Sequence, residues 1–160
     1  MKKTISIIIS IAMCAMLASC GGVKNEVSDT EQPTLIDTMS LEEKVGQILF
    51  VRCVEDGQTD DLMSIKPGGI LMFGRDFEGL TKDEVKEKIQ SYQDKSDIPL
   101  IIGADEEGGT VVRVSSNPNL APEKFKSPQE IYNEGGMDAV VENATEKSEL
   151  LLSLGVNMNI

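Results

Sequence analysis

The chain has 160 residues, which is room for one ordinary domain, and it carries 27 acidic against 15 basic residues, a formal net charge of −12. A surface this acidic repels nucleic-acid phosphates and anionic lipid headgroups. The composition therefore excludes nucleic acid as a partner, and it excludes membrane attachment through a basic patch.

Residues 1–19 have the pattern of a secretion signal. Lys2 and Lys3 precede a short apolar run, TISIIISIAMCAMLA, and small residues then lead into Cys20. An apolar run this short is typical of a signal peptide rather than a membrane span. The sequence LASC resembles the bacterial lipobox, in which the cysteine is lipidated and becomes the mature N-terminus. We predict an extracytoplasmic protein that a lipid on Cys20 anchors to the bacterial cell membrane; the alternative is an ordinary signal peptide with an incidental cysteine.

Residues 20–37 are interpreted as the lipidated cysteine and a flexible tether, because this stretch is polar, lacks periodicity and contains glycine and proline. Cys14 would leave with the signal peptide and Cys20 would be modified, so Cys53 has no disulfide partner. Cys53 lies in the apolar segment ILFVRCV and is predicted to be a buried structural thiol.

From Ser40 onward, predicted strands alternate with predicted helices. Three capping boxes, Ser40–Glu43, Thr81–Glu84 and Ser127–Glu130, indicate helix starts. Apolar segments at 47–53, 70–73, 100–104 and 156–160 predict strands. In the last helix, Val140, Ala144, Leu151 and Leu154 are expected to form one buried stripe. This order favours an α/β fold whose parallel sheet is covered on both faces.

The segment IPLIIGADEEGGTVVRV, residues 98–114, contains the candidate site. An apolar strand leads directly into Asp105, Glu106 and Glu107, followed by two glycines. Three adjacent carboxylates are costly to desolvate, so we expect water or a polar ligand to reach them. Loops that follow parallel strands are where α/β proteins usually place their chemistry.

Five blocks of the sequence carry a family resemblance: MSLEEKVGQILFVR, PGGILMFGRDF, IPLIIGADEEGGTVVRV, FKSPQEI and LLLSLGVNMNI, in that order. They resemble the N-terminal domain of glycoside hydrolase family 3, in particular bacterial β-N-acetylhexosaminidases of the β-N-acetylglucosaminidase type. The resemblance implies a (β/α)8 TIM barrel, of which residues 38–160 would form about the first half. Because the chain stops at or just after a predicted strand, we expect it to be a fragment.

The same resemblance assigns two substrate-binding residues. The aspartate that matches Asp105 accepts hydrogen bonds from sugar hydroxyls in the family, and the arginine that matches Arg113 contacts the bound sugar. The two glycines, Gly108 and Gly109, would keep the loop free of side chains so that a sugar ring can approach. Glu106, where the family often has glutamine, and Glu107 are interpreted as loop-shaping or solvated acids.

A further pair of charged residues follows the second predicted strand. Arg75 and Asp76 lie in FGRDF and are interpreted as a structural ion pair rather than as catalytic groups.

The implied reaction is hydrolysis of terminal β-linked N-acetylhexosamine with retention, on an oligosaccharide or a peptidoglycan-derived substrate. No metal, organic cofactor or protein partner is implied. The family's nucleophile and its histidine acid/base come later in the barrel, and this sequence has no histidine. We therefore assign no catalytic residue and predict that the chain is inactive on its own. A tethered sugar-binding lipoprotein and a non-functional remnant are the alternatives.

Overall fold

The computed structural model of the chain describes residues 33–55 and 57–160. The predicted signal peptide, Cys20 and residues 20–32 of the predicted tether lie outside the described residues. A short helix, α2 (Leu35–Thr38), overlaps the end of the segment that was predicted to be a tether. Across the described ranges, no helix is both long enough and apolar enough to cross a membrane.

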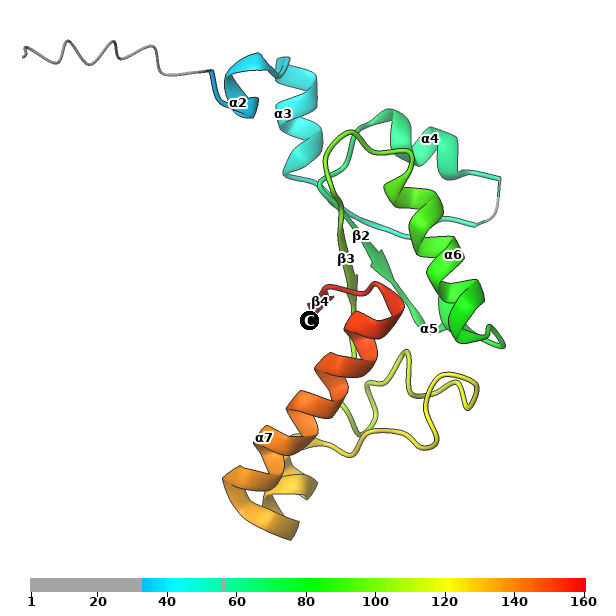
Figure 1. The fold of residues 1–160 in the computed structure, drawn as a ribbon, viewed down its shortest axis with the longest axis vertical. Helices are drawn as coiled ribbons and strands as arrows, with labels where there is room; N and C mark the ends of the chain where they lie inside the picture. The colour runs from blue at the N-terminus through cyan, green and yellow to red at the C-terminus, as the bar shows by residue number, and fades with distance from the viewer. Residues whose placement is uncertain (1–32, 56) are drawn as a thin grey trace, which may run out of the picture. The chain divides into compact units, whose positions relative to one another are not determined.

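Four parallel strands lie side by side in chain order (Figure 1). They are β1 (Phe50–Arg52), β2 (Gly69–Met72), β3 (Ile101–Ala104) and β4 (Met158–Asn159). The helices that precede and connect them are α3 (Leu41–Gln47), α4 (Thr59–Ser64), α5 (Gly74–Phe77), α6 (Lys82–Gln93) and α7 (Pro128–Leu154). The alternation predicted from the sequence is confirmed, although β1, β3 and β4 are shorter than predicted, β2 begins and ends one residue earlier, and α5 was not predicted.

The three predicted capping boxes are present at the starts of α3, α6 and α7. The buried stripe on α7 differs from its prediction. Leu151 and Leu154 are buried, but Ala144 is exposed, and Lys147 is buried in its neighbourhood instead. The long lysine side chain can bury its methylene stem while its ammonium group reaches a backbone carbonyl, which the apolar pattern alone does not indicate.

The hydrophobic core lies between the sheet and its helices. Four strand residues, Ile70, Met72, Ile102 and Ala104, are fully buried and belong to one cluster with side chains of α6 and α7. Cys53 joins this core, as predicted, with its Sγ 3.0 Å from the hydroxyl of Tyr92. Burial raises the pKa of the Cys53 thiol, which keeps it in the unreactive protonated form.

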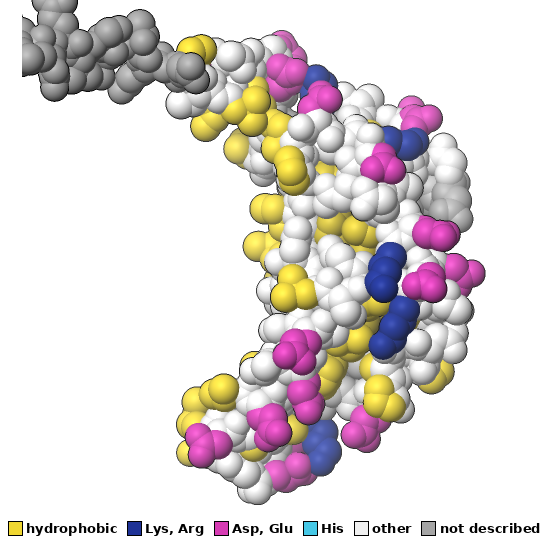
Figure 2. All heavy atoms as spheres, viewed as in Figure 1, with side chains coloured by type: hydrophobic (Ala, Val, Ile, Leu, Met, Phe, Trp, Pro, Cys, Tyr) yellow, Lys and Arg dark blue, Asp and Glu magenta, His cyan; other side chains and the backbone are white. Residues whose placement is uncertain are grey.

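The opposite face of the sheet has no helix over it in the described part of the chain. The strand register places Phe50, Ile101 and Met158 on this face, and they remain 39%, 46% and 42% exposed. Figure 2 shows apolar side chains along the side of the sheet away from α6. The prediction that both faces are covered was wrong for these residues. In a (β/α)8 barrel the helices cover only the outer face, and the inner face points into the barrel.

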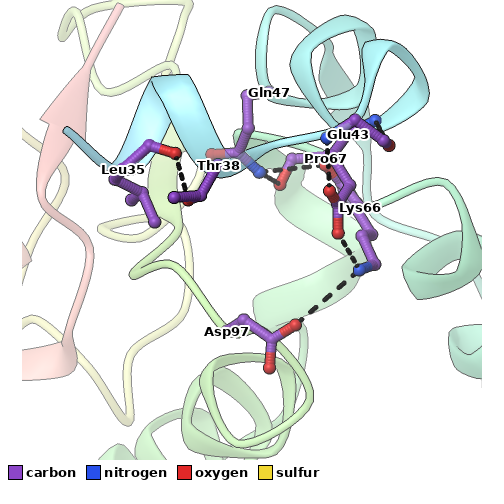
Figure 3. A network of polar contacts seen from close by, with 8 residues as sticks. Leu35, Thr38, Glu43, Gln47, Lys66, Pro67 and Asp97 are labelled. Atoms are coloured by element: carbon purple, nitrogen blue, oxygen red, sulfur yellow. Dashed lines mark hydrogen bonds and ion pairs between the residues drawn. The ribbon is translucent and has the colours of Figure 1, made fainter. Parts of the chain in front are cut away.

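Helix α3 is held against the turn that precedes β2, at the end of the sheet where the strands begin (Figure 3). The Gln47 side chain donates to the carbonyl of Lys66 at 3.0 Å, and the Gly68 amide donates to the carbonyl of Gly46 at 3.1 Å. Lys66 also forms an ion pair with Glu43. The hydrogen bond from Lys66, together with the capping bond from the Ser40 amide, lowers the pKa of Glu43 to about 2. These contacts fix the direction in which the chain enters β1.

Replacing Gly46 with alanine tests this contact. A Cβ atom at Gly46 would lie 2.2 Å from the carbonyl oxygen of Ile65, which is backbone and cannot move aside cheaply. We expect Gly46→Ala to lower the free energy of unfolding by about 1–3 kcal/mol, the usual cost of overpacking. Urea unfolding followed by circular dichroism measures it. The matched control is Gly74→Ala, where the nearest atom is 4.0 Å away and the change should stay within about 0.5 kcal/mol. Equal stability of the two variants would contradict the packing argument.

Candidate functional site

Asp105 and Arg113 meet at the end of the sheet where the strands finish. Asp105 is the first residue after β3, and its Oδ2 lies 3.1 Å from Nη2 of Arg113. Their side chains are 21% and 29% exposed. The structure thus brings together the two residues predicted to bind substrate, and it leaves both reachable from solvent. Their contact with a sugar stays a prediction.

Glu106 shapes the loop that carries this pair. Its side chain is fully buried, and Oε2 accepts hydrogen bonds from the backbone amides of Arg113 at 2.7 Å and Val114 at 2.6 Å. Its Oε1 accepts from the hydroxyl of Ser115, and at 3.3 Å from the Ser115 amide. A buried carboxylate needs this many donors to offset the loss of its hydration. Of the two interpretations of Glu106, the loop-shaping one is confirmed.

The backbone of Glu106 is also held by hydrogen bonds. Its amide donates to Oδ1 of Asn159 at 2.8 Å, and its carbonyl accepts from Nδ2 of Asn159 at 3.0 Å. Asn159 belongs to β4, so the strand next to β3 holds the start of the loop. This role of Asn159 was not predicted from the sequence, although a polar residue inside a predicted strand was a possible signal.

Lys147 on α7 anchors the next residue of the loop. Its Nζ donates to the carbonyl of Glu107 at 2.7 Å and lies 5.5 Å from the centre of the Phe125 ring. Burial lowers the pKa of Lys147, while the carboxylates of Glu106 and Glu107 act against this shift. The Glu107 side chain itself points to solvent, which confirms its interpretation as a solvated acid.

Gly108 and Gly109 serve the packing of the loop. Gly108 has a φ of 103°, and a Cβ atom there would lie 2.2 Å from the carbonyl oxygen of Lys126. The Gly109 amide donates to the carbonyl of Phe125 at 2.8 Å. The geometry therefore differs from the expectation that these glycines clear space for a sugar ring, because they let residues 125–127 approach the loop closely.

Phe73, the residue after β2, borders the Asp105–Arg113 pair. The guanidinium carbon of Arg113 lies 5.8 Å from the centre of the Phe73 ring, and that of Arg52, at the end of β1, lies 4.7 Å from it. The Nε of Arg113 is buried and has no hydrogen-bond partner among the described residues. Neither Phe73 nor Arg52 was singled out from the sequence.

The predicted ion pair between Arg75 and Asp76 is confirmed, with Nε of Arg75 3.7 Å from Oδ1 of Asp76. The Arg75 guanidinium also donates to the carbonyl of Cys53 at 3.1 Å and lies 3.7 Å from the Glu55 carboxylate. Asp76 is buried and accepts a hydrogen bond from the Phe73 amide at 2.8 Å. These contacts connect the ends of β1 and β2 and leave Asp76 in a structural role. Within residues 33–55 and 57–160, no group of three acidic, cysteine or histidine side chains could hold a metal ion.

A parallel sheet of βα units with a polar pair at the ends of its strands is typical of the α/β class of domains, which place their sites at that edge of the sheet. The chain belongs to glycosyl hydrolase family 3, because the model of the family's N-terminal domain matches residues 40–160. A solved structure similar to it is that of a glycoside hydrolase family 3 β-N-acetylglucosaminidase from Paenibacillus sp. str. FPU-7. The two are 25% identical with a TM-score of 0.68 over 76% of this chain and 24% of that chain. No curated protein sequence matches the chain.

These comparisons confirm the predicted family and the TIM-barrel fold class. The chain spans about a quarter of the length of the solved structure that it matches. What the whole protein binds or cleaves is therefore a matter for proposal.

The Glu106 contacts predict a graded series of stabilities. Glu106→Ala leaves several buried amides without an acceptor and should lower the free energy of unfolding by about 2–4 kcal/mol. Glu106→Gln keeps one carbonyl acceptor and nearly the same shape, so its cost should stay below about 1.5 kcal/mol. Urea denaturation of each variant measures both values. Glu107→Ala, with its exposed side chain, is the matched control and should change stability by less than about 0.5 kcal/mol. A Glu106→Ala variant as stable as this control would refute the loop-shaping role.

Proposed function

We propose that this chain forms the saccharide-binding part of a retaining glycosidase that removes terminal β-linked N-acetylhexosamine. The observation that carries the proposal is the partly exposed Asp105–Arg113 pair after β3, on the positions that the family resemblance assigns to sugar binding. Membership of glycosyl hydrolase family 3 supports a carbohydrate substrate. The similar β-N-acetylglucosaminidase structure supports the N-acetylhexosaminide as the particular sugar.

The chemistry of the pair suits a sugar. A carboxylate accepts hydrogen bonds from two neighbouring hydroxyl groups, and a guanidinium group donates several in one plane. The contact between Asp105 and Arg113 is a single one at 3.1 Å, so each group keeps hydrogen-bonding capacity for a ligand. The aromatic ring of Phe73 beside them offers an apolar wall to the carbon skeleton of a sugar.

Catalysis needs more than this pair. A retaining glycosidase uses two carboxyl groups about 5–5.5 Å apart, one as nucleophile and one as acid/base, except where another group takes one of the roles. At this end of the described sheet, Glu106 is fully buried and bonded to three backbone amides, and Asp76 is buried and bonded to Phe73. Neither can approach a glycosidic bond. We therefore propose that residues 1–160 bind saccharide without hydrolysing it.

The cellular setting is proposed from residues 1–20 alone. The basic start, the apolar run and the small residues before Cys20 support export and lipid attachment at that cysteine. An anchor on the outer side of the cell membrane would place the sugar site where peptidoglycan-derived saccharides are found.

The substitution Asp105→Asn tests the proposed sugar site. N,N′-Diacetylchitobiose should bind the full 160-residue chain, and Asp105→Asn should weaken that binding at least about tenfold, because a charged acceptor of hydroxyl protons is lost. A titration followed by NMR measures the dissociation constants. The matched control is Glu107→Gln, which removes an exposed carboxylate of the same loop and should leave binding unchanged. Thermal melts of both variants separate loss of binding from loss of fold. Equal binding by Asp105→Asn and Glu107→Gln would exclude Asp105 from the site.

The absence of turnover is tested with p-nitrophenyl N-acetyl-β-glucosaminide. We expect residues 1–160 to release no p-nitrophenol above the rate of a buffer blank, because Glu106 and Asp76 are buried and the sequence has no histidine that could act as the family's acid/base. Release that disappears in the Asp105→Asn variant would show that the chain is catalytic by itself and would overturn this part of the proposal.

A further inference from the structure

Arg52 has an unusual environment for an arginine of an acidic protein. It is the last residue of β1, it is exposed, and its guanidinium lies over the Phe73 ring at 4.7 Å from the ring centre. No described carboxylate lies within ion-pair distance of it, whereas both other arginines near this end of the sheet have such a partner. The chain has 27 acidic residues, so an arginine without an acidic partner among residues 33–55 and 57–160 needs an explanation.

The described carboxylates near Arg52 each interact with another group. Asp105 is paired with Arg113, and Asp76 with Arg75. Glu55 lies 3.7 Å from the Arg75 guanidinium, and the buried Glu106 carboxylate accepts hydrogen bonds from residues 113–115. Among the residues that the structure describes, the positive charge of Arg52 is therefore not balanced by a nearby carboxylate.

Arg52 faces the same side as the proposed sugar site. The register pairs Arg52 with Leu71 and, through it, with Gly103, so its side chain leaves the sheet on the uncovered face. Met72 and Ala104, the last residues of β2 and β3, point toward the helices. Because successive side chains of a strand alternate between its two faces, the next residues, Phe73 and Asp105, point toward the uncovered face. Arg113 lies 5.8 Å from the same Phe73 ring. The guanidinium groups of Arg52 and Arg113 thus lie near the same Phe73 ring, which brings Arg52 close to the Asp105–Arg113 pair.

We infer that Arg52 binds a carboxylate carried by the saccharide that the Asp105–Arg113 pair holds, and so selects acidic over neutral sugars. A guanidinium group matches the two oxygens of a carboxylate, and stacking on Phe73 holds its plane in position without using its hydrogen-bond donors. The inference rests on the proposed function and extends it by naming the charge of the substrate.

A matched pair of disaccharides tests the inference. N,N′-Diacetylchitobiose is neutral, and its aldonic acid has C1 of the reducing end oxidised to a carboxylate. The full chain should bind the acid about five- to tenfold more tightly than the neutral sugar at low ionic strength. High salt should reduce this preference, because added ions screen the charge of an exposed arginine.

Three variants locate the preference. Arg52→Gln should bind the acid and the neutral sugar equally, with its affinity for the neutral sugar unchanged. Arg52→Lys keeps the charge without the planar fork and should retain part of the preference. Lys44→Gln removes an exposed positive charge from α3, at the far end of the sheet, and should behave as the unmodified chain.

The outcomes separate the two proposals. Equal binding of acid and neutral sugar by the unmodified chain, or a preference that survives Arg52→Gln, would overturn the role of Arg52 while leaving an Asp105-dependent sugar site intact. If neither sugar binds, the sugar site itself fails, and the role of Arg52 fails with it.

Discussion

The buried carboxylate of Glu106 is the contact on which the candidate site depends. Its two oxygens gather the backbone amides of residues 113–115, which lie seven to nine positions further along the chain. Without the Glu106 carboxylate, the backbone amides of residues 113–115 would need other hydrogen-bond acceptors. The position of the Arg113 side chain follows from this backbone, because its own amide is one of the three. Glu106 thus supports the Asp105–Arg113 pair from its buried side.

The loop is in turn held by the βα unit that follows it in sequence. Asn159 of β4 bonds both backbone groups of Glu106, and Lys147 of α7 bonds the carbonyl of Glu107. Each of these residues lies 40 or more positions after the loop residue that it contacts, so the site geometry is complete only when α7 has packed and β4 has paired with β3. The same unit contributes Leu151 and Leu154 to the core. Helix α7, which helps to complete the site geometry, therefore also helps to complete the described core.

The sequence predicted the local features well, since they depend on neighbouring residues. Capping boxes need only two residues three apart, and all three were found where predicted. The assignment of Asp105 and Arg113 to one binding site came from the family resemblance and not from their spacing, and the ion pair between them was not predicted. Features that depend on distant residues were missed: the burial of Lys147 follows from a carbonyl 40 positions away, and the proximity of Arg52 to Phe73 follows from the register of β1 and β2. The length of β1 was overestimated because an apolar run does not distinguish the last turn of a helix from the start of a strand.

The three consecutive acids differ in burial, and only the middle one has a structural role in the loop. Backbone that leaves a strand in extended form points successive side chains to opposite sides, so Asp105 and Glu107 face outward while Glu106 faces inward. An outward carboxylate keeps its hydration and stays available to a ligand. An inward one loses its hydration and is tolerated only because backbone amides and a hydroxyl surround it. The inner position requires an acceptor and not a charge, which explains why glutamine, the residue that the family often has there, can fill it. In the sugar site that we propose, the outer position has no such freedom, because a residue that accepts hydrogen bonds from sugar hydroxyls while staying paired with Arg113 would need the full carboxylate of Asp105.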